Sequence, residues 1–485
     1  MSSDTASAPI STTEFTDMIL GQLPFTPNTQ QRLVAGALAR FCSSSTPSDS
    51  VFILAGYAGT GKTSLIGALV KALTAIRIPV VLLAPTGRAA KVFSTSASYP
   101  ASTIHRRIYY GATRLLEHSH AVRDNKTPGA VFIVDEASMI GDSSADAEGN
   151  PGSGLLEDLL QHVFTGEGCR LILSGDTAQL PPVGTDLSPA MSPARLKEMG
   201  LHVSRATLTD TARQQRDSGI LRNATLLRRS MLADPLPRPR LLQAGLDDVN
   251  VATGEDIIDV IAQCYSRDTP DETILITRSN KRAVAFNLAV RSQILYSEEE
   301  LCRGERLMIA RNNYTYSTKI KDLDFIANGD MAVVTHVNAT ERRYGFRFAD
   351  VTLRLTHHDK EIDCKIILDT LTSEYPSLSR EQMEKLAMAR MDDPEVNPPG
   401  TPDSTRLSRL RSDVYFNALQ VKYAYAITCH KAQGSQWRNV IVDLGGIAED
   451  AMGLDFYRWL YTAVSRATRR LYFLNPSIQI DGYKD

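Results

Sequence analysis

The segment Gly56–Ser64, GYAGTGKTS, decides the fold of this chain. The apolar run Val51–Ala55 (VFILA) precedes it, and the helix-forming stretch Leu65–Lys71 (LIGALVK) follows it. A G-x-x-x-x-G-K-[ST] loop between a strand and a helix is a phosphate loop, whose backbone N–H groups close around a polyphosphate at the positive end of the helix. A chance glycine-rich turn is the alternative, and the flanking strand and helix argue against it. We therefore expect nucleotide contacts from the whole loop: Gly56, Tyr57, Ala58, Gly59, Thr60, Gly61, Lys62, Thr63 and Ser64.

Four side chains would supply the chemistry of this site. Lys62 would reach the β- and γ-phosphates, and the Thr63 hydroxyl would hold Mg²⁺. Asp135 and Glu136 directly follow the apolar run Ala130–Val134. Asp135 is suited to the Mg²⁺ of the nucleotide, and Glu136 is suited to polarising the attacking water. An isolated Asp-Glu pair is more often a solvated turn, so this interpretation depends on the phosphate loop.

Composition sets wide limits. The chain has 485 residues, of which 43% are hydrophobic and 22% charged, as in ordinary globular proteins of more than one domain. The formal net charge is −2, so no overall basic excess indicates nucleic acid, although a local cationic groove can lie on a neutral protein. The six cysteines are scattered without a C-x-x-C pair, which favours a reducing, cytoplasmic location, nucleoid-associated in a bacterium.

The chain contains no apolar stretch long enough to span a membrane, so we expect no membrane partner. Its first residues, MSSDTASAPISTT, lack the basic and apolar regions of a signal peptide and predict a disordered tail over residues 1–13.

Alternating apolar runs and helical stretches predict an α/β protein with two parallel sheets. Each run reads as a buried strand that ends at a polar loop. The first set is Val80–Ala84, Ala130–Val134 and Arg170–Ser174, and the second is Thr273–Thr277, Val440–Val442 and Arg470–Leu474. Between the two sets, the alternating texture of about Gly304–Leu355 predicts a small antiparallel barrel.

Further motifs follow the phosphate loop in a diagnostic order. The loop, DEAS at Asp135–Ser138 and GDTAQLPPVG at Gly175–Gly184 resemble motifs I, II and III of superfamily 1 helicases, specifically the RecD/Dda-like branch of superfamily 1B. The resemblance reaches from about Phe25 to Leu474. Its other motifs match Thr26–Gln31, Ala84–Lys91, Ser102–His105, Leu208–Gln214, Ala426–Gln436 and Tyr461–Ala467.

The resemblance implies two RecA-like P-loop domains with two inserts. Core 1A would span 14–207 and carry a β-hairpin pin insert, 1B, at about 109–128. Core 2A would comprise 208–302 and 414–485, and an SH3-like barrel insert, 2B, would span 303–413. No aromatic residue occurs from Gly111 to Pro128, so the identity of the pin residue stays open.

The resemblance also implies how ATP is recognised. Gln31, with Gln30 as the alternative register, would contact the adenine, and Gln179 would sense the γ-phosphate. Arg213 and Arg466 would be arginine fingers, although an arbitrary arginine is more often an exposed salt-bridge partner. Gly434 is assigned to the nucleotide site as well.

Single-stranded DNA would follow a track over both cores. The implied contacts are Pro85, Thr86, Thr103 and His105 on the first core, and Asn280, Thr428, His430 and Lys431 on the second. For His105 a structural role, and for Asn280 a solvated cationic turn, are the alternatives.

The family implies an ATP-dependent DNA helicase that moves 5′ to 3′, with ATP and Mg²⁺ as cofactors. Single-stranded and forked DNA would be its substrates, and the monomer would be functional. Single-stranded-DNA-binding, replication or recombination proteins are candidate partners. A translocase that displaces proteins, or the motor subunit of a recombination nuclease, is the alternative. An ATP-gated binding module without motor activity is disfavoured by Glu136 and the two candidate fingers.

Overall fold

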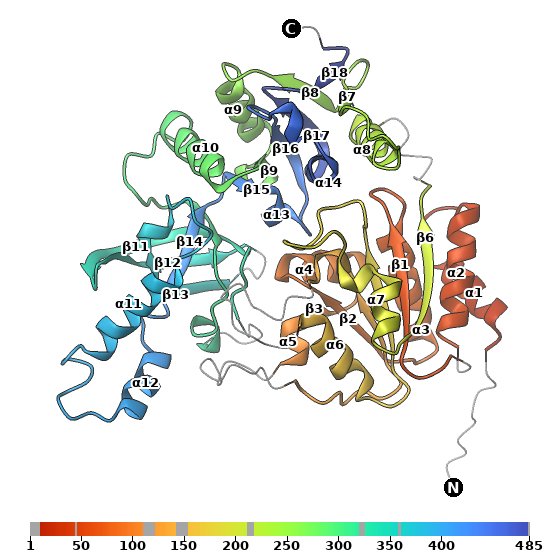
Figure 1. The fold of residues 1–485 in the computed structure, drawn as a ribbon, viewed down its shortest axis with the longest axis horizontal. Coiled ribbons are helices and arrows are strands. Elements are labelled where there is room, and N and C mark those ends of the chain that lie inside the picture. Colours follow the sequence, from red (N-terminus) through yellow and green to blue (C-terminus); the bar gives the residue numbers. More distant parts are fainter. Residues whose placement is uncertain are drawn as a thin grey trace.

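The structure, a computed structural model, describes residues 10–43, 46–109, 122–141, 154–210, 218–319, 325–356 and 360–483. Two α/β lobes lie one above the other in Figure 1, and a β-barrel lies beside them on the left. The first lobe contains the N-terminal sheet, and the second lobe contains the C-terminal one. The predicted α/β class with two parallel sheets is confirmed.

The sheet of the first lobe has the strand order β3-β2-β4-β5-β1-β6, and all its pairs are parallel. Its strands are β1 (Ser50–Gly56), β2 (Val80–Ala84), β3 (Ala101–Thr103), β4 (Val131–Val134), β5 (Arg170–Gly175) and β6 (His202–Leu208). Its helices are α1 (Thr12–Gly21), α2 (Thr29–Phe41), α3 (Lys62–Ala75), α4 (Gly87–Ala97), α5 (Ile104–Ile108), α6 (Leu155–Phe164) and α7 (Pro193–Glu198).

Alternate residues of the central strand β1 enter two different cores. Phe52 and Leu54 pack in a cluster with residues of α1, α2 and α3, while Val51 and Ile53 pack in a cluster with residues of α5, α6 and α7. Both faces of the sheet are thus covered, as the continuous apolar strands require.

Helix α1 begins inside the segment predicted to be a disordered tail. The Ser11 hydroxyl accepts a hydrogen bond from the Glu14 N–H, and the Glu14 carboxylate accepts one from the Ser11 N–H. This capping box satisfies two N–H groups at the helix start, so residues 11–13 belong to folded structure. The prediction of disorder up to residue 13 is therefore wrong for these three residues.

The sheet of the second lobe has the order β15-β9-β16-β17-β8, again all parallel. Its strands are β8 (Val249–Ala252), β9 (Thr273–Thr277), β15 (Ala426–Thr428), β16 (Trp437–Asp443) and β17 (Ala467–Leu474). Its helices are α8 (Gly219–Ser230), α9 (Ile257–Arg267), α10 (Asn280–Gln293), α13 (Cys429–Ala432) and α14 (Leu454–Val464). A separate pair joins β7 (Arg240–Leu242) to β18 (Gln479–Asp481).

A closed barrel of five strands lies between β9 and β15 in the sequence. Its strands are β10 (Arg306–Ile309), β11 (Met331–Arg343), β12 (Phe346–Leu355), β13 (Lys360–Ile367) and β14 (Leu419–Tyr423), with α11 (Arg380–Met391) and α12 (Asp403–Arg411) before the last strand. Short 3₁₀ turns occur at Ala137–Met139, Pro189–Met191, Pro270–Glu272, Tyr316–Lys319, Leu368–Thr370 and Glu449–Ala451.

The barrel is confirmed, but one of its pairs, β13 with β14, is parallel instead of antiparallel, and its predicted end at residue 413 is wrong. Strand β14 closes the barrel by pairing with β10 and β13, and it lies beyond that boundary. The barrel also shares one hydrophobic core with the second sheet, in which Leu307 and Val351 pack with Leu275 and Ile441. The predicted likeness to an SH3 domain stays a prediction.

Most of the predicted pin insert, residues 110–121, lies outside the described residues. Its flanks are described, and Tyr109 and Val122 form an antiparallel bridge. In the described part of the chain, no helix is long and apolar enough to cross a membrane.

Candidate nucleotide site between the two lobes

The phosphate loop joins β1 to α3, as the sequence predicts. Gly59 and Gly61 have φ of +73° and +86°, a backbone region that residues with a Cβ rarely adopt. A Cβ on Gly61 would lie 2.8 Å from Nε2 of Gln31, and one on Gly56 would lie 2.7 Å from Cγ of Lys62. The glycines therefore allow both the turn of the loop and its close packing.

Lys62 begins α3 and folds back over the loop. Its ammonium group donates hydrogen bonds to the carbonyl oxygens of Gly56 and Tyr57. The cation thus lies inside the loop, where it can reach the phosphates of a bound nucleotide.

The two candidate adenine-reading glutamines both bind other parts of the protein. Gln31 closes a capping box with Asn28 and donates a hydrogen bond of 3.1 Å to the Thr60 carbonyl oxygen. The Gln30 amide donates to the Thr209 hydroxyl and accepts from the Thr209 N–H at 2.7 Å. Gln31 therefore braces the phosphate loop, while Gln30 fixes the segment after β6. The assignment of either to adenine stays a prediction.

Asp135 and Glu136 follow β4 in the interior of the cleft. The Ser174 hydroxyl donates a hydrogen bond of 2.9 Å to the Asp135 carboxylate. Burial raises the pKa of Asp135, although Lys62 opposes this shift. Burial and the Asp135 charge raise the pKa of Glu136, which Arg466 and Lys62 partly offset. Glu136 also has a φ of +54°, a conformation that costs a non-glycine residue about 1–3 kcal/mol and concentrates at functional sites.

The donor set fits a nucleotide-bound Mg²⁺. A hydroxyl at Thr63 and a carboxylate at Asp135 are the hard oxygen ligands that Mg²⁺ takes, usually one or two from the protein and the others from phosphates and water. Among the described residues, no group of three or more His, Cys, Asp or Glu could hold a metal ion.

Tyr461 on α14 reaches across the cleft from the second lobe. Its hydroxyl accepts a hydrogen bond of 2.9 Å from the N–H of Ala58 in the phosphate loop. The same hydroxyl donates a hydrogen bond of 2.7 Å to Asp176, which follows β5. One side chain of the second lobe therefore joins two loops of the first.

The motif around Gln179 forms further bonds between the lobes. The Leu180 N–H donates to the Thr462 hydroxyl at 2.8 Å, and the Leu180 carbonyl oxygen accepts from the Gln433 amide at 2.7 Å. Gln179 is buried beside them, and its Oε1 has no hydrogen-bond partner among the described residues. A buried acceptor without a partner is unusual, so Oε1 of Gln179 could accept a hydrogen bond from a ligand.

The two candidate arginine fingers differ in what the structure describes. Arg466 is 3% exposed and donates to the carbonyl oxygens of Thr462 and Ser435 and to the Ser465 hydroxyl. Its charge acts on the pKa of Glu136 across the cleft. Arg213 lies outside the described residues.

Gly434 lies close to the first lobe. A Cβ there would lie 3.2 Å from the Cβ of Ala89 and 3.6 Å from the Thr86 hydroxyl, both on the first lobe. Beside it, Arg88 stacks on the Trp437 ring at 4.1 Å and donates to the Gln436 carbonyl oxygen. Gly434 is thus a point of close approach between the lobes, and its assignment to the nucleotide site stays a prediction.

The candidate DNA residues of the first lobe follow β2 and β3. Pro85 directly follows β2, while Thr86 and Thr103 cap α4 and α5 with their hydroxyls. The His105 ring lies 5.7 Å from that of Tyr109 and 6.3 Å from that of Phe325, which belongs to the loop before β11 of the barrel.

The candidate DNA residues of the second lobe lie at the starts of two helices. Asn280 begins α10, Thr428 is the N-cap of α13, and His430 is exposed on α13. Lys431 donates to the side chain of Asn328, and burial lowers the pKa of Lys431 to about 8. The barrel loop that carries Phe325 and Asn328 thus contacts candidate DNA residues of both lobes.

Tyr461, Thr462 and Asp176 lie inside the sequence motifs, but the motifs alone predict no role for them. Their spacing contains no signal for these roles, which come from contacts between the two lobes.

Two family models match the chain. The first, described as an AAA domain, matches residues 28–236, and the second, described as a UvrD-like helicase C-terminal domain, matches residues 423–474. These ranges contain the phosphate loop and the Arg466 segment respectively.

Curated relatives match parts or all of the chain. The ATP-dependent RecD2 DNA helicase of Deinococcus radiodurans is 36% identical over 135 residues, 28% of this chain and 16% of that protein. The ATP-dependent DNA helicase Pif1 of a Psychrobacter species is 30% identical over 138 residues, 27% of this chain and 20% of that protein. An uncharacterized protein of Acanthamoeba polyphaga mimivirus is 22% identical over 515 residues, 92% of this chain and 99% of that protein.

The chain therefore spans well under two thirds of the RecD2 and Pif1 relatives that it matches. Among solved structures, a Pif1 helicase from Bacteroides in complex with ADP-AlF3 and ssDNA aligns over 93% of this chain and 92% of that chain, with 15% identity and a TM-score of 0.46.

Proposed function

We propose that the chain is a superfamily 1B helicase, an ATP-dependent DNA helicase that moves 5′ to 3′ on single-stranded DNA and unwinds duplexes. The observation that carries the proposal is the cleft itself. Side chains of the second lobe, Tyr461 and Arg466, act on the phosphate loop and on Glu136 of the first. Hydrolysis at such a cleft is coupled to the relative position of the two lobes.

Each residue of the cleft then has a role in hydrolysis. Lys62 and the loop N–H groups would hold the β- and γ-phosphates. Thr63 and Asp135 would hold Mg²⁺, which would neutralise charge on the phosphates. Glu136 orients the attacking water and accepts its proton, for which a raised pKa is suited. Arg466, together with Arg213, stabilises the charge that develops on the transferred group.

Movement would come from the contacts between the lobes. Gln179 has a buried acceptor without a partner and lies beside Leu180, which binds Thr462 and Gln433 of the second lobe. A γ-phosphate that engages Gln179 would shift this segment and, through it, the second lobe. The DNA track lies on both lobes, so opening and closing of the cleft would change the distance between two grips on the strand.

The direction of movement and the presence of a strand-separating insert are inferred from the resemblance to superfamily 1B helicases. The proposal is supported by the barrel loop, whose Phe325 contacts His105 near the bridge of Tyr109 and Val122. We propose that the insert between these two residues is the pin and that the barrel braces it.

The decisive experiment is strand displacement on partial duplexes with a 5′ tail, a 3′ tail or no tail, in the presence of ATP and Mg²⁺. We expect unwinding only with the 5′ tail, stimulation of ATP hydrolysis by single-stranded DNA, and loss of both in Lys62→Ala, which removes the cation of the loop. Preference for a 3′ tail would refute the direction. Hydrolysis and movement without strand displacement would instead identify a translocase that displaces proteins or depends on a partner.

A further inference from the structure

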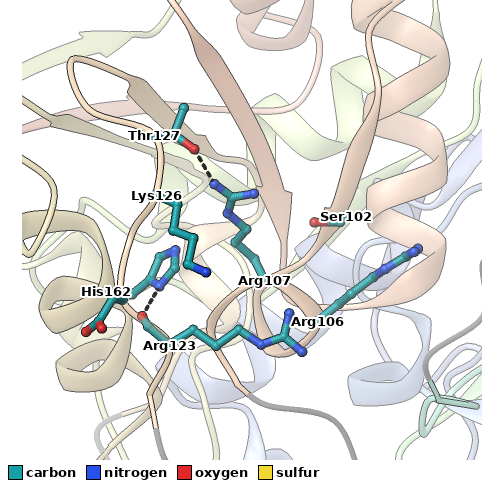
Figure 2. A pocket seen from close by; sticks show the side chains of 8 residues that line it. Ser102, Arg106, Arg107, Arg123, Lys126, Thr127 and His162 are labelled. Atoms are coloured by element: carbon teal, nitrogen blue, oxygen red, sulfur yellow. Dashed lines mark hydrogen bonds between the residues drawn. The ribbon is translucent and has the colours of Figure 1, made fainter.

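A cationic cavity of about 550 Å³ lies on the first lobe, outside the nucleotide cleft (Figure 2). Helix α5 contributes Arg106 and Arg107 to its lining, and the segment between Val122 and β4 contributes Arg123 and Lys126. Among the described lining residues, Asp124 is the one carboxylate. The four cations and single carboxylate of this described lining favour an anion as the ligand.

His162 of α6 forms part of the lining and is 2% exposed. Its Nδ1 lies 2.6 Å from the Arg123 carbonyl oxygen, to which it must donate because that oxygen can only accept (Figure 2). Nε2 of the ring is buried and has no hydrogen-bond partner among the described residues. Native proteins seldom leave such an atom unsatisfied, so the ring is built to receive a partner that the described chain does not supply.

Arg107 shows the same feature. Its guanidinium donates to the Thr127 hydroxyl at 2.8 Å, but its buried Nε has no partner in the part of the chain that the structure describes. Burial lowers the pKa of Arg107, and the charge of Arg123 lowers it further. A desolvated cation next to a second cation is stabilised by a bound anion, which offsets both the repulsion and the lost hydration.

The position of the cavity indicates the source of the anion. Ser102 lines the cavity and immediately precedes the candidate DNA residue Thr103, while Arg123 and its neighbours follow the bridge of Tyr109 and Val122. Thr103 and His105 do not line the cavity. The cavity therefore lies beside the DNA track, at the base of the insert where a duplex would be separated.

We propose that this cavity binds a backbone phosphate of the duplex arm of forked DNA, and not of the strand held in the track. The proposal rests on the proposed helicase function. Arg107 and Lys126 would donate to the phosphate oxygens, and His162 would donate through Nε2 after taking up a proton. This contact would hold the junction against the insert while the motor advances.

The first test uses Lys126→Gln, because Lys126 is exposed and its replacement should leave the fold intact. Lys71→Gln is the matched control, since Lys71 is also an exposed lysine of the first lobe but lies on α3, which packs against the opposite face of the sheet. Binding to forked DNA and to single-stranded DNA is measured without nucleotide by fluorescence anisotropy over a range of salt concentrations.

We expect Lys126→Gln to weaken fork binding about 3- to 10-fold and to reduce the slope of log K against log salt by about 1, as for the loss of one phosphate contact. Single-stranded-DNA binding and stimulated ATP hydrolysis should not change, and Lys71→Gln should behave as the wild type. Equal weakening on both DNAs would make the cavity part of the track, and unchanged fork binding would remove it as a site. Either outcome overturns the proposal.

The second test uses proton uptake by His162. The charged groups that face its ring are Arg107, Arg123, Asp124 and Lys126. Asp158 lies one turn earlier on α6, where its carboxylate accepts a hydrogen bond from the Tyr109 hydroxyl. Burial lowers the pKa of His162, so the ring is neutral when the cavity holds no anion. Phosphate binding should raise that pKa.

Fork binding relative to single-stranded-DNA binding should therefore strengthen as the pH falls from about 8 to about 6. His162→Gln, checked for folding by thermal unfolding, should lose this pH dependence. If millimolar inorganic phosphate binds in the cavity of the wild type, while both variants bind forked DNA as the wild type does, the cavity is a free-anion site. The DNA assignment then fails. Failure of the proposed function would look different, as absent ATP hydrolysis in the wild type.

Discussion

Tyr461→Phe tests the coupling between the two lobes with the loss of one oxygen atom. The hydroxyl of Tyr461 accepts from the Ala58 N–H at 2.9 Å and donates to Asp176 at 2.7 Å. Both partners belong to the first lobe, and the tyrosine belongs to the second. Phenylalanine keeps the ring and the packing of α14, so the substitution removes these two hydrogen bonds and little else.

The magnitude follows from the kind of bond that is lost. A buried hydrogen bond to a charged group contributes about 1.5–3 kcal/mol. Asp176 keeps one bond after the substitution, since it also accepts from the Ala178 N–H at 3.0 Å. We therefore take about 2 kcal/mol as the loss, which shifts the equilibrium between closed and open cleft about 30-fold toward open.

The assay is DNA-stimulated ATP hydrolysis at saturating ATP. If hydrolysis requires the closed cleft, turnover should fall about 10- to 30-fold. Tyr457→Phe is the matched control, because Tyr457 lies one turn earlier on α14 and donates to the Pro237 carbonyl oxygen within the second lobe. It loses a bond of similar length without touching the cleft, and its turnover should stay near that of the wild type.

Two results would refute this reasoning. Wild-type turnover in Tyr461→Phe would mean that the bridge does not stabilise the active arrangement. An equal decrease in Tyr457→Phe would mean that α14 is merely destabilised, which thermal unfolding of both variants would reveal.

Three further predictions follow from the site. Glu136→Gln should bind ATP yet hydrolyse it at least about 100-fold more slowly, measured by single-turnover kinetics, and near-normal turnover would exclude Glu136 as the base. Arg466→Lys should reduce DNA-stimulated turnover by about 10³-fold with little change in ATP affinity, measured by titration, since a lysine cannot reproduce the guanidinium contacts. The pKa of Lys431 is lowered to about 8, so DNA affinity should fall from about pH 7 to about pH 9 as the side chain loses its charge, whereas Lys431→Arg should bind equally over this range.

Much of the fold could be predicted from local patterns. Buried parallel strands are continuous apolar runs, and the run at Thr273–Thr277 coincides with β9. The barrel was harder because its last strand is separated from the others by α11 and α12. Closure by β14 depends on pairing with β10, more than a hundred residues earlier, and no local periodicity encodes that contact.

The nucleotide site was predictable where its residues are neighbours in the sequence. The phosphate loop and the Asp135-Glu136 pair each carry their chemistry within a few positions. The cross-lobe contacts of Tyr461 and the placement of Gly434 against Ala89 depend on how two domains meet, which spacing does not encode. The cationic cavity shows the same limit, since Arg107, Lys126 and His162 come from three separate segments.

The shared core of the barrel and the second sheet determines how motion can travel. Leu307 and Val351 of the barrel pack in one cluster with Leu275 and Ile441 of the sheet, so barrel and sheet move together as one body. That body contacts the first lobe at the phosphate loop, through Tyr461, and at the candidate DNA residue His105, through Phe325. We infer that a change of cleft angle at the phosphate loop displaces the barrel loop relative to His105, unless the axis of rotation passes through both contacts.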